Sequence, residues 1–399
     1  MEFEINVEHS LIVAILVLGV GAKLNKRLTF LSNYNIPAAV TGGLICSSLV
    51  AICEIFFDLK IRFDMAQRDT LLLVFFSTIG LSAKLSRLRE GGRALAWMAL
   101  LATGFLIIQN TVGLTIATLF GVDPFYGLIA GSISFSGGHG TTITWGQLAA
   151  SKGLVAAPEI GLACATIGLV AGGLVGGPVA HRLIRTHSLS GDPEEEACIT
   201  SPESKSKFIP VTLDGMLNSI FLLTVCVAAG AIVNEYLKAH GYTVPGFLTS
   251  LAVGVVLTNT MDLMGRDYNP NAIGLCSDIS LQLFLGLSLM SMQLTTIFGN
   301  ADKLVLVTIC QVAVMVAYAY FIVFRVMGKD YDACVIAVGY IGMGLGATPV
   351  GIANMHAITE KYGASTKAFL VIPLIGAFFV DIANAVVIQG FLALPAFDW

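Results

Sequence analysis

Apolar runs recur along the whole chain and are separated by short polar breaks. In the first half they cover 9–24, 35–57, 70–83, 94–120, 125–150 and 154–180, and in the second half 215–237, 244–263, 278–298, 304–326, 333–355 and 367–394. A helix needs about 20 predominantly apolar residues to cross a bilayer. The pattern therefore predicts an all-α integral membrane protein.

One polar stretch divides the chain into two similar halves. Residues 181–214 contain the charged sequences GDPEEE and SPESKSK. Such a segment cannot bury enough apolar surface to fold into a core. We therefore predict an N-terminal repeat over 1–180, a solvated linker over 181–214 and a C-terminal repeat over 215–399.

Each half contains one apolar run that glycine and hydroxyl residues interrupt. These are SFSGGHGTTITWG at 134–146 and YIGMGLGATPVGIA at 340–353. Irregular backbone is tolerated at membrane depth only where protein buries it or where it lines a water-filled cavity. Glycine-interrupted segments at matching places in two halves indicate a transporter binding site. At a constant offset of 207, the matching residues are Gly121, Asp123, Ile129, Ala130, Gly137 and Thr141 with Gly328, Asp330, Ile336, Ala337, Gly344 and Thr348.

The basic residues favour an inverted arrangement of the two halves. If 125–150 and 333–355 are re-entrant hairpins, each half has five spans. With both termini outside, 16 of the 22 Lys and Arg residues then lie inside. If both segments cross fully, the split is 12 to 10. The positive-inside rule favours the hairpins and places the linker in the cytoplasm.

Composition excludes several other classes of protein. The chain has 399 residues, of which 56% are hydrophobic and 12% charged, whereas soluble domains are about 25% charged. The net charge of −4 gives no indication of nucleic-acid binding, and the eight cysteines form no CxxC motif. No P-loop, metal-ligand cluster or catalytic pair is visible, so we predict neither an enzyme nor a cofactor. The acidic start MEFEINVEH does not match a basic signal sequence, so the first run is expected to remain as a helix.

The tips of the two hairpins are the candidate binding residues. Half-helix N-termini can bind anions, and freed carbonyls with hydroxyl groups can bind sodium. No Lys or Arg lies in the middle of any span, so an anionic substrate would depend on such dipoles and on bound cations. The alternative is that small residues only allow close helix packing. The candidate substrate-binding residues are Ser136, Gly137, Gly138, Gly140, Thr141, Thr142, Gly344, Gly346, Thr348 and Pro349.

Sodium ligands are predicted from the hydroxyl groups and from one deep acid. Asp381 lies far inside the last span, with Asn384 three residues later on the same helix face. An intramembrane acid is a functional candidate by default, although a structural hydrogen bond remains the alternative for Asp381. We predict Thr141, Thr348, Asp381 and Asn384 as sodium ligands, and a hydrogen-bonding role for His139 rather than proton coupling.

The motifs SGGHGTTITWG at 136–146 and GMGLGATPVG at 342–351, with the two five-helix halves and the central linker, resemble the bacterial sodium/glutamate symporter family. The resemblance covers essentially the whole chain. It implies sodium-coupled uptake of L-glutamate, with Na⁺ as the coupling ion, across the bacterial inner membrane. It also implies a homodimer in the lipid bilayer and an elevator-type mechanism, in which a mobile domain carries the hairpins past a fixed scaffold. Both termini are then periplasmic.

Three other functions stay open from the residues alone. The first is a sodium-coupled carboxylate symporter of the citrate type. A cation/proton antiporter should need two or more intramembrane acids together, whereas only Asp381 is deep. A channel would not need two inverted hairpins around one site.

Overall fold

The computed structural model describes residues 2–28, 37–57, 59–86, 92–191, 210–240, 245–291, 301–395 and 397. The chain divides into two compact units, each combining a segment from each half of the sequence. Unit 1 comprises Met1–Ser86 and Ile209–Gly299, and unit 2 comprises Arg87–Phe208 and Asn300–Trp399. The boundary between the two units therefore falls at a corresponding place in each half of the sequence.

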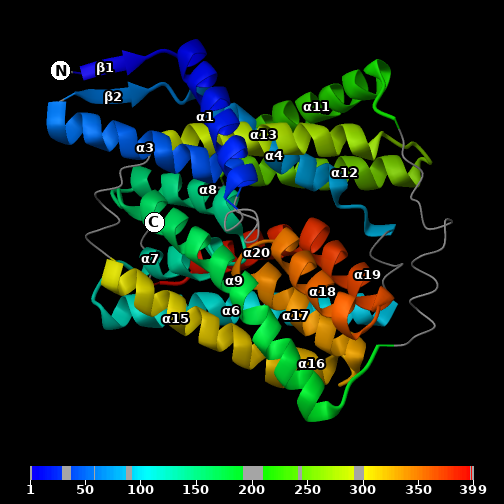
Figure 1. Cartoon of the computed structure of the whole chain (residues 1–399). Coiled ribbons are helices and arrows are strands. Elements are labelled where there is room, and N and C mark those ends of the chain that lie inside the picture. The colour runs from blue at the N-terminus through cyan, green and yellow to red at the C-terminus, as the bar shows by residue number, and fades with distance from the viewer. Residues whose placement is uncertain are drawn as a thin grey trace. The chain divides into compact units, whose positions relative to one another are not determined.

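Unit 1 is a bundle of long helices around α4 and α13 (Figure 1). α4 packs against α12 and α13, while α13 also packs against α1 and α3. Between α4, α11 and α13, the buried side chains of Leu81, Leu222, Leu223, Cys226 and Ile273 form a continuous apolar core. The helices are α1 (Val7–Arg27), α3 (Ala38–Phe57), α4 (Ala66–Ser82), α11 (Leu213–Ala239), α12 (Gly246–Leu263) and α13 (Pro270–Met290).

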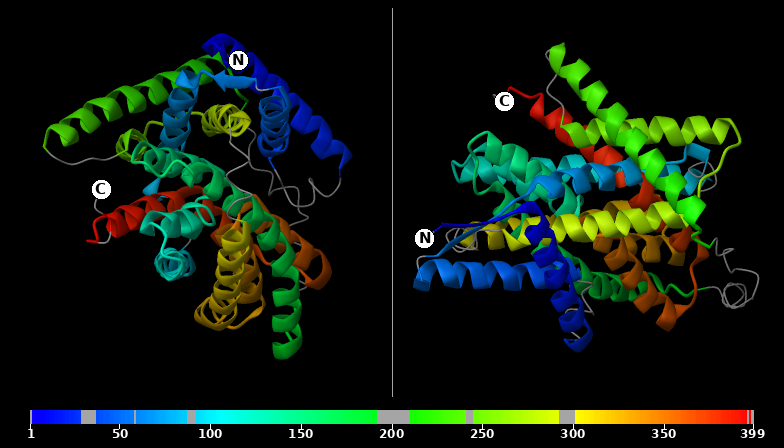
Figure 2. Two further views of the ribbon diagram at one scale, coloured as in Figure 1. Left: turned by 90° about the vertical axis from the view of Figure 1, so that its left-hand side faces the viewer. Right: turned by 90° about the horizontal axis from the view of Figure 1, so that it is seen from above.

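A short parallel strand pair also belongs to unit 1, and the all-α prediction did not include it. Strand β1 (Glu2–Ile5) precedes α1, and strand β2 (Lys60–Phe63) precedes α4. Their register pairs Phe3 with Ile61 and places Glu4 opposite Arg62, so these two opposite charges face each other across the pair. The two strands run side by side near the N-terminus (Figure 2). The sequence signal is weak because each strand has only four residues.

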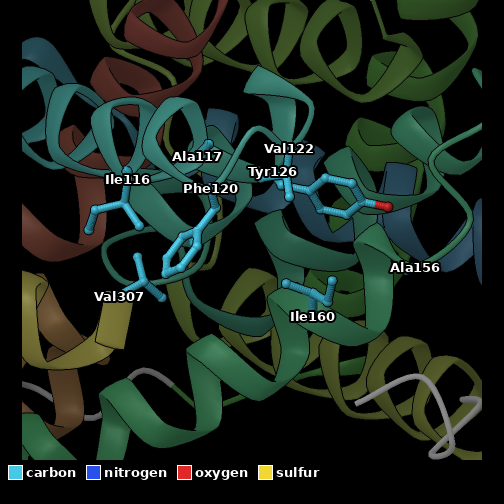
Figure 3. Close-up of a pocket in the computed structure, with 11 residues that line it drawn as sticks. Ile116, Ala117, Phe120, Val122, Tyr126, Ala156, Ile160 and Val307 are labelled. Atoms are coloured by element: carbon cyan, nitrogen blue, oxygen red, sulfur yellow. The ribbon is translucent and has the colours of Figure 1, made fainter. Parts of the chain in front are cut away.

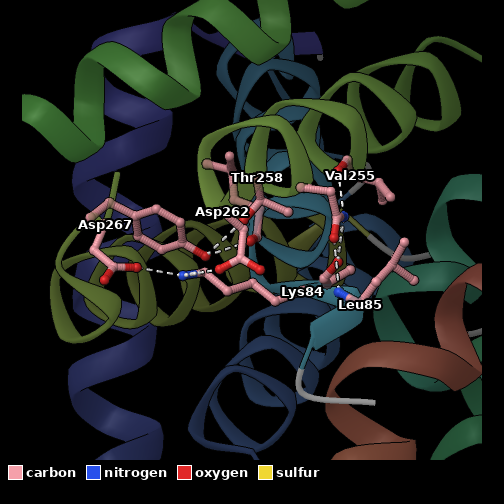
Figure 4. A network of polar contacts seen from close by, with 10 residues as sticks. Lys84, Leu85, Val255, Thr258, Asp262 and Asp267 are labelled. Atoms are coloured by element: carbon pink, nitrogen blue, oxygen red, sulfur yellow. Dashed lines mark hydrogen bonds and ion pairs between the residues drawn. The ribbon is translucent and has the colours of Figure 1, made fainter. Parts of the chain in front are cut away.

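A polar cluster holds the C-terminal end of α4 against the corner between α12 and α13 (Figure 4). Lys84 Nζ lies 2.7 Å from Asp267 Oδ1 and 3.5 Å from Asp262 Oδ1. The same ammonium group lies 5.1 Å from the centre of the Tyr268 ring. Burial alone would lower the pKa of Lys84, but the hydrogen bond and charge of Asp267 raise it above its ordinary value. Lys84 therefore stays charged at neutral pH.

Backbone groups at this end of α4 are bound by side chains from the neighbouring elements. Tyr268 Oη donates to the carbonyl oxygen of Leu81, and Asn259 Nδ2 donates to that of Ala83 at 3.0 Å. Asn259 Oδ1 accepts from the backbone N–H of Leu85 at 2.9 Å. Because helix ends leave carbonyl groups unsatisfied, these contacts fix where the chain leaves α4.

Unit 2 contains two interrupted helices and a long helix, α9, that packs against both of them (Figure 1). α9 contacts α8 of the first interrupted helix and α17 and α18 of the second. In chain order the elements are α6 (Gly92–Leu119), α7 (Pro124–Leu128), the π-helical η1 (Ile129–Ile133), α8 (Gly138–Ser151), α9 (Ala157–His187), α15 (Ala301–Tyr318), the π-helical η3 (Ala319–Val323), α16 (Phe324–Val326), α17 (Tyr331–Leu345), α18 (Thr348–Tyr362), α19 (Thr366–Leu374), the π-helical η4 (Ile375–Phe379) and α20 (Val380–Leu392).

Eight helices among the described residues are long and apolar enough to cross a membrane. They are α1, α3, α6, α9, α11, α12, α13 and the helix over Val305–Val326. The other two predicted spans correspond to α4, which has 17 residues, and to the helix through α19, η4 and α20. The helical, membrane-spanning class of the protein is thus confirmed. Of the predicted linker, residues 192–209 lie outside the described residues.

Residues that match between the halves perform the same structural task at the entry to each interrupted helix. Gly121 and Gly328 both adopt positive φ, at 63° and 128°, a region that glycine occupies without strain. Two residues later, Asp123 Oδ1 accepts from the N–H of Phe125 at 2.8 Å, and Asp330 Oδ1 from that of Ala333 at 2.7 Å. Each aspartate is the N-cap of its helix.

Candidate functional site at two broken helices

The first interrupted helix breaks at Ala130 and Gly131. Ala130 has ψ 16° and Gly131 has φ −111° and ψ −134°, so neither continues the helix. A β-carbon on Gly131 would lie 2.7 Å from Asn110 Oδ1, so a larger residue there would displace the Asn110 side chain of α6. After the turn at 134–137, α8 begins with Gly138 at φ 65°.

Three buried amide side chains bind the backbone groups that this break releases. Gln311 Nε2 of α15 donates to the carbonyl oxygen of Ala130 at 3.0 Å. Asn110 Oδ1 of α6 accepts from the N–H of Ser132 at 2.9 Å. Asn384 of α20 donates from Nδ2 to the Ser132 carbonyl at 3.0 Å and accepts from Ser132 Oγ at 2.6 Å. Unpaired backbone groups in an apolar interior cost several kcal/mol, so these amides stabilise the break.

The second interrupted helix breaks between Leu345 and Thr348. The linking residue Ala347 is extended, with φ −163° and ψ 160°. Pro349 lies in the first turn of α18, a position where the missing N–H of proline leaves no helical hydrogen bond unmade. α17 and α18 then run back along each other as an antiparallel pair, since Gly342 lies against Gly351 and Gly339 against Met355.

The two tips meet inside unit 2. A β-carbon on Gly138 would lie 3.5 Å from the carbonyl oxygen of Gly346. Ser136 Oγ lies 3.1 Å from the carbonyl oxygen of Gly344, which Gln109 Nε2 also binds at 2.8 Å. The structure therefore brings together the two glycine-rich stretches, although they are about two hundred residues apart in sequence.

Glycines on α9 allow the long helix to approach both broken helices. A β-carbon on Gly161 would lie 2.4 Å from Thr142 Cγ2. One on Gly168 would lie 2.4 Å from the Leu345 carbonyl oxygen, beside the second tip. Larger residues would push the tips away from α9, so this helix sets the positions of both.

Asp381 lies on a helix face that touches both tips. A β-carbon on Gly376 would lie 2.2 Å from Thr348 Oγ1, and Asn384 Nδ2 would lie 2.8 Å from a β-carbon on Gly137. Asp381 follows Gly376 by five residues across the π-helical turn and precedes Asn384 by three. Residues at these spacings share one face. The half-buried carboxylate of Asp381 is thus placed between the two tip contacts, and no other described residue binds it.

The electrostatics of the site come from backbone dipoles and from this one acid. Residues 123–151, 331–360 and 380–392 contain no Lys or Arg. α8 and α18 both begin at the tips, and the positive ends of their helix dipoles favour negative ligand groups there. Asp381 favours a cation in the same region. The arrangement can therefore hold an anionic solute together with a cation.

Some predicted site residues face the interior rather than the junction of the tips. Thr142 is fully buried. Its hydroxyl group lies within hydrogen-bond distance of Gly138 O, Ser134 Oγ and Ile133 O. Gly140 is also buried, and its carbonyl accepts from Thr144 Oγ1 at 2.9 Å. Both amide ends of Asn384 bind Ser132. The residues that keep accessible surface at the tips are Ser136, Gly137, Gly138, Thr348, Pro349 and Asp381, while Thr141, Gly344 and Gly346 are buried beside them.

His139 is buried and bound to α9. Thr166 Oγ1 donates to the Leu162 carbonyl oxygen at 2.8 Å, so it can only accept from His139 Nε2, 3.1 Å away. The ring is therefore held as the tautomer with a proton on Nε2. This contact supports the predicted hydrogen-bonding role of His139.

Four site residues were not predicted from the sequence: Gln109, Asn110, Ser132 and Gln311. The sequence signal for such a residue is an amide side chain in an otherwise apolar span, as in the sequence ICQVAVMV around Gln311. That signal identifies a residue needing a partner, but it does not identify the partner, which lies 181 residues away at Ala130.

A separate cavity of about 150 Å³ lies beside the first broken helix (Figure 3). Its walls come from the second half of α6, from α7 and η1, and from Ile160 and Val307. The lining is apolar apart from Tyr126 and includes no charged side chain. A charged solute would lose its hydration there without compensation, so the cavity is not the candidate site.

A family model described as sodium/glutamate symporter matches residues 3–364. The chain belongs to the sodium/glutamate symporter family. The sodium/glutamate symporter of Escherichia coli K12 is 41% identical over 400 residues, covering 99% of each chain. That of Haemophilus influenzae is 38% identical over 397 residues, covering 98% of each. The matched region thus includes both broken helices and unit 1 from residue 3 onward.

Among solved structures, the sodium proton antiporter MjNhaP1 from Methanocaldococcus jannaschii aligns with 97% of this chain and 98% of its own. The sequence identity is 14% and the TM-score is 0.41.

Proposed function

We propose that this protein is a sodium-coupled symporter that carries L-glutamate into the cell by alternating access. The observation that carries the proposal is the junction of the two broken helices, in a chain about 40% identical over its whole length to proteins named sodium/glutamate symporters. The half-helix N-termini would receive the carboxylates of glutamate, and Asp381 with nearby oxygens would receive sodium.

Sodium is the natural partner because unit 2 offers the substrate no Lys or Arg side chain at the tips. Glutamate at neutral pH has a net charge of −1, and a cell interior is negative. Moving one charge across 100 mV is worth about 2.3 kcal/mol. Two or more sodium ions per glutamate would make the transported charge positive, so that the membrane potential drives uptake.

The architecture we propose has two inverted repeats of five spans, each with one re-entrant hairpin. Two findings support it: the halves are divided between the units at corresponding places, and matched residues cap the two broken helices. Because all candidate binding residues belong to unit 2, this unit would be the moving domain of an elevator and unit 1 the scaffold. A homodimer in the bacterial inner membrane completes the proposal.

Uptake of labelled glutamate into proteoliposomes tests the function directly. An inward sodium gradient should drive accumulation, and an inside-negative potential should increase it. Labelled citrate should not enter under the same gradient. Accumulation driven by a proton gradient in sodium-free buffer, or citrate uptake equal to that of glutamate, would refute the proposal in favour of the alternatives.

The orientation of the protein gives a second prediction. In a chain whose native cysteines are replaced, a cysteine at exposed Ser190, just after α9, should react with an impermeant maleimide only from the cytoplasmic side. A cysteine at exposed Lys152, between α8 and α9, should react from outside intact cells and serves as the control. Labelling of the Ser190 position from outside, with the Lys152 position reacting only from the cytoplasmic side, would contradict the re-entrant hairpin, because full crossing of both segments places the linker outside.

A further inference from the structure

Two buried glutamines connect the first broken helix to the tip of the second. Gln109 of α6 and Gln311 of α15 are both fully inaccessible to solvent. Neither side chain contacts the surface, yet their hydrogen bonds form one continuous path between elements far apart in sequence. Buried amides in an apolar span require partners, and here the partners are functional elements.

Gln311 forms the end of this path at the first broken helix. Its Nε2 donates to the carbonyl oxygen of Ala130 at 3.0 Å and to that of Gln109 at 2.9 Å. Both of these partners are carbonyl oxygens, which only accept hydrogen bonds. The donor Nε2 must therefore face them, since Oε1 is itself an acceptor. Oε1 therefore points the other way, and it has no hydrogen-bond partner among the described residues.

Gln109 forms the end at the second tip. Its Nε2 donates to the carbonyl oxygen of Gly344 at 2.8 Å, and its Oε1 accepts from Ser136 Oγ at 2.5 Å. The backbone carbonyl of the same residue is the one that Gln311 binds. A single residue thus contacts both tips and the break.

We propose that Gln311 and Gln109 form a relay that couples sodium binding at Oε1 of Gln311 to substrate binding at the second tip. This inference rests on the proposed function and adds the residues through which the two ligands communicate. An unpaired buried acceptor costs about 1–3 kcal/mol, and a cation beside it would remove that cost.

The direction of the coupling follows from the polarity of the amide. A cation at Oε1 withdraws electrons from the amide and makes both N–H groups stronger donors. The bonds to Ala130 and to the Gln109 carbonyl tighten, which holds Gln109 and, through it, Gly344 and Ser136 in place. A tip that is already ordered binds substrate with a smaller entropic loss. Sodium therefore raises glutamate affinity, and glutamate raises sodium affinity by the same factor.

The test compares Gln109→Met and Gln311→Met with the unaltered protein, because methionine keeps the side-chain length and removes the amide. Purified protein is titrated with sodium alone, with glutamate at low sodium and with glutamate at high sodium. Ligand-dependent shifts of the melting temperature report binding without requiring transport. Gln389→Met, at a half-buried glutamine near the end of α20, is the matched control.

Gln109→Met should bind sodium alone with an affinity within about threefold of the unaltered protein, while the coupling factor, typically about 5–150-fold, falls close to 1. Gln311→Met should lose the coupling and also bind sodium alone at least about tenfold more weakly, since a charge-assisted contact contributes about 1.5 kcal/mol or more. In the double variant the coupling should be no lower than in either single variant, as expected for residues in one path. Gln389→Met should keep the full coupling factor.

The relay is refuted if both methionine variants couple sodium to glutamate within about twofold of the unaltered protein. Equal loss of coupling in Gln389→Met would refute it as well, because the effect would then not be specific to the path. If Gln109→Met does not fold, Gln109→Asn replaces it, since that amide is too short to reach Gly344 and should show the same loss. Glutamate binding that is independent of sodium in the unaltered protein would instead refute the proposed function.

Discussion

Gly351→Val is expected to abolish sodium-driven glutamate uptake. A β-carbon at this position would lie 2.4 Å from the carbonyl oxygen of Gly339, a distance at which the two backbones cannot remain together. A β-carbon on Gly342, on the opposite helix, would in turn lie 2.6 Å from the backbone nitrogen of Gly351. Overpacking of this kind costs about 1–3 kcal/mol when side chains can move, and more when backbone must shift. α17 and α18 would separate, and the second tip would no longer meet the first.

The measurement is glutamate uptake in proteoliposomes together with the melting temperature of the purified protein. Gly390→Val is the matched control, because it makes the same change in α20, where a β-carbon would meet nothing within 4 Å. The control should keep nearly normal uptake, while Gly351→Val loses it and melts at lower temperature. Normal uptake by Gly351→Val would show that the close contact between α17 and α18 is not required.

The features predicted correctly from the sequence depend on local chemistry. Gly121 with Gly328, and Asp123 with Asp330, were matched by spacing alone, and each pair adopts one conformation and one capping role. Local rules of this kind act over a few residues, so they are visible in the sequence. The same is true of Pro349 in the first turn of α18.

One helix boundary was wrong because a capping signal was overlooked. The apolar run suggested a span starting at residue 278, whereas α13 starts at Pro270. Asn269 accepts from the N–H groups of Asn271 and Ala272, and Pro270 follows it at the first helical position. An Asn-Pro pair at a helix start is a recognised signal, but the mixed polarity of the first two turns concealed it.

The partners of the buried amides could not be predicted from one sequence. Asn384 was placed beside Asp381 as a sodium ligand, but its amide binds Ser132, which lies 252 residues away. Gln109 and Gly344 are 235 residues apart. Which of many polar groups meet across a helical bundle depends on the packing of whole helices, and periodicity within one span does not contain that information. A role for Asn384 at the ion remains a prediction.

Asp381→Asn is expected to weaken sodium binding about a hundredfold and to reduce uptake to background. The carboxylate is half-buried between the contacts that α20 and η4 make with the two tips, and no other described residue binds it. Asparagine keeps the shape and removes the charge. Taking away one partner of a desolvated ion pair costs about 3 kcal/mol or more, which corresponds to roughly a hundredfold in affinity.

Sodium titration in the absence of glutamate, followed by the shift in melting temperature, separates the two possible partners of Asp381. If Asp381 binds sodium, Asp381→Asn loses the sodium-induced shift even without substrate. If it binds the ammonium group of glutamate, sodium binding stays normal and only the affinity for glutamate falls. Glu360→Gln is the matched neutralisation control, because Glu360 is exposed near the end of α18. We expect the first outcome, because the tips contain no Lys or Arg side chain and the ion must supply the positive charge that holds the carboxylates of the substrate.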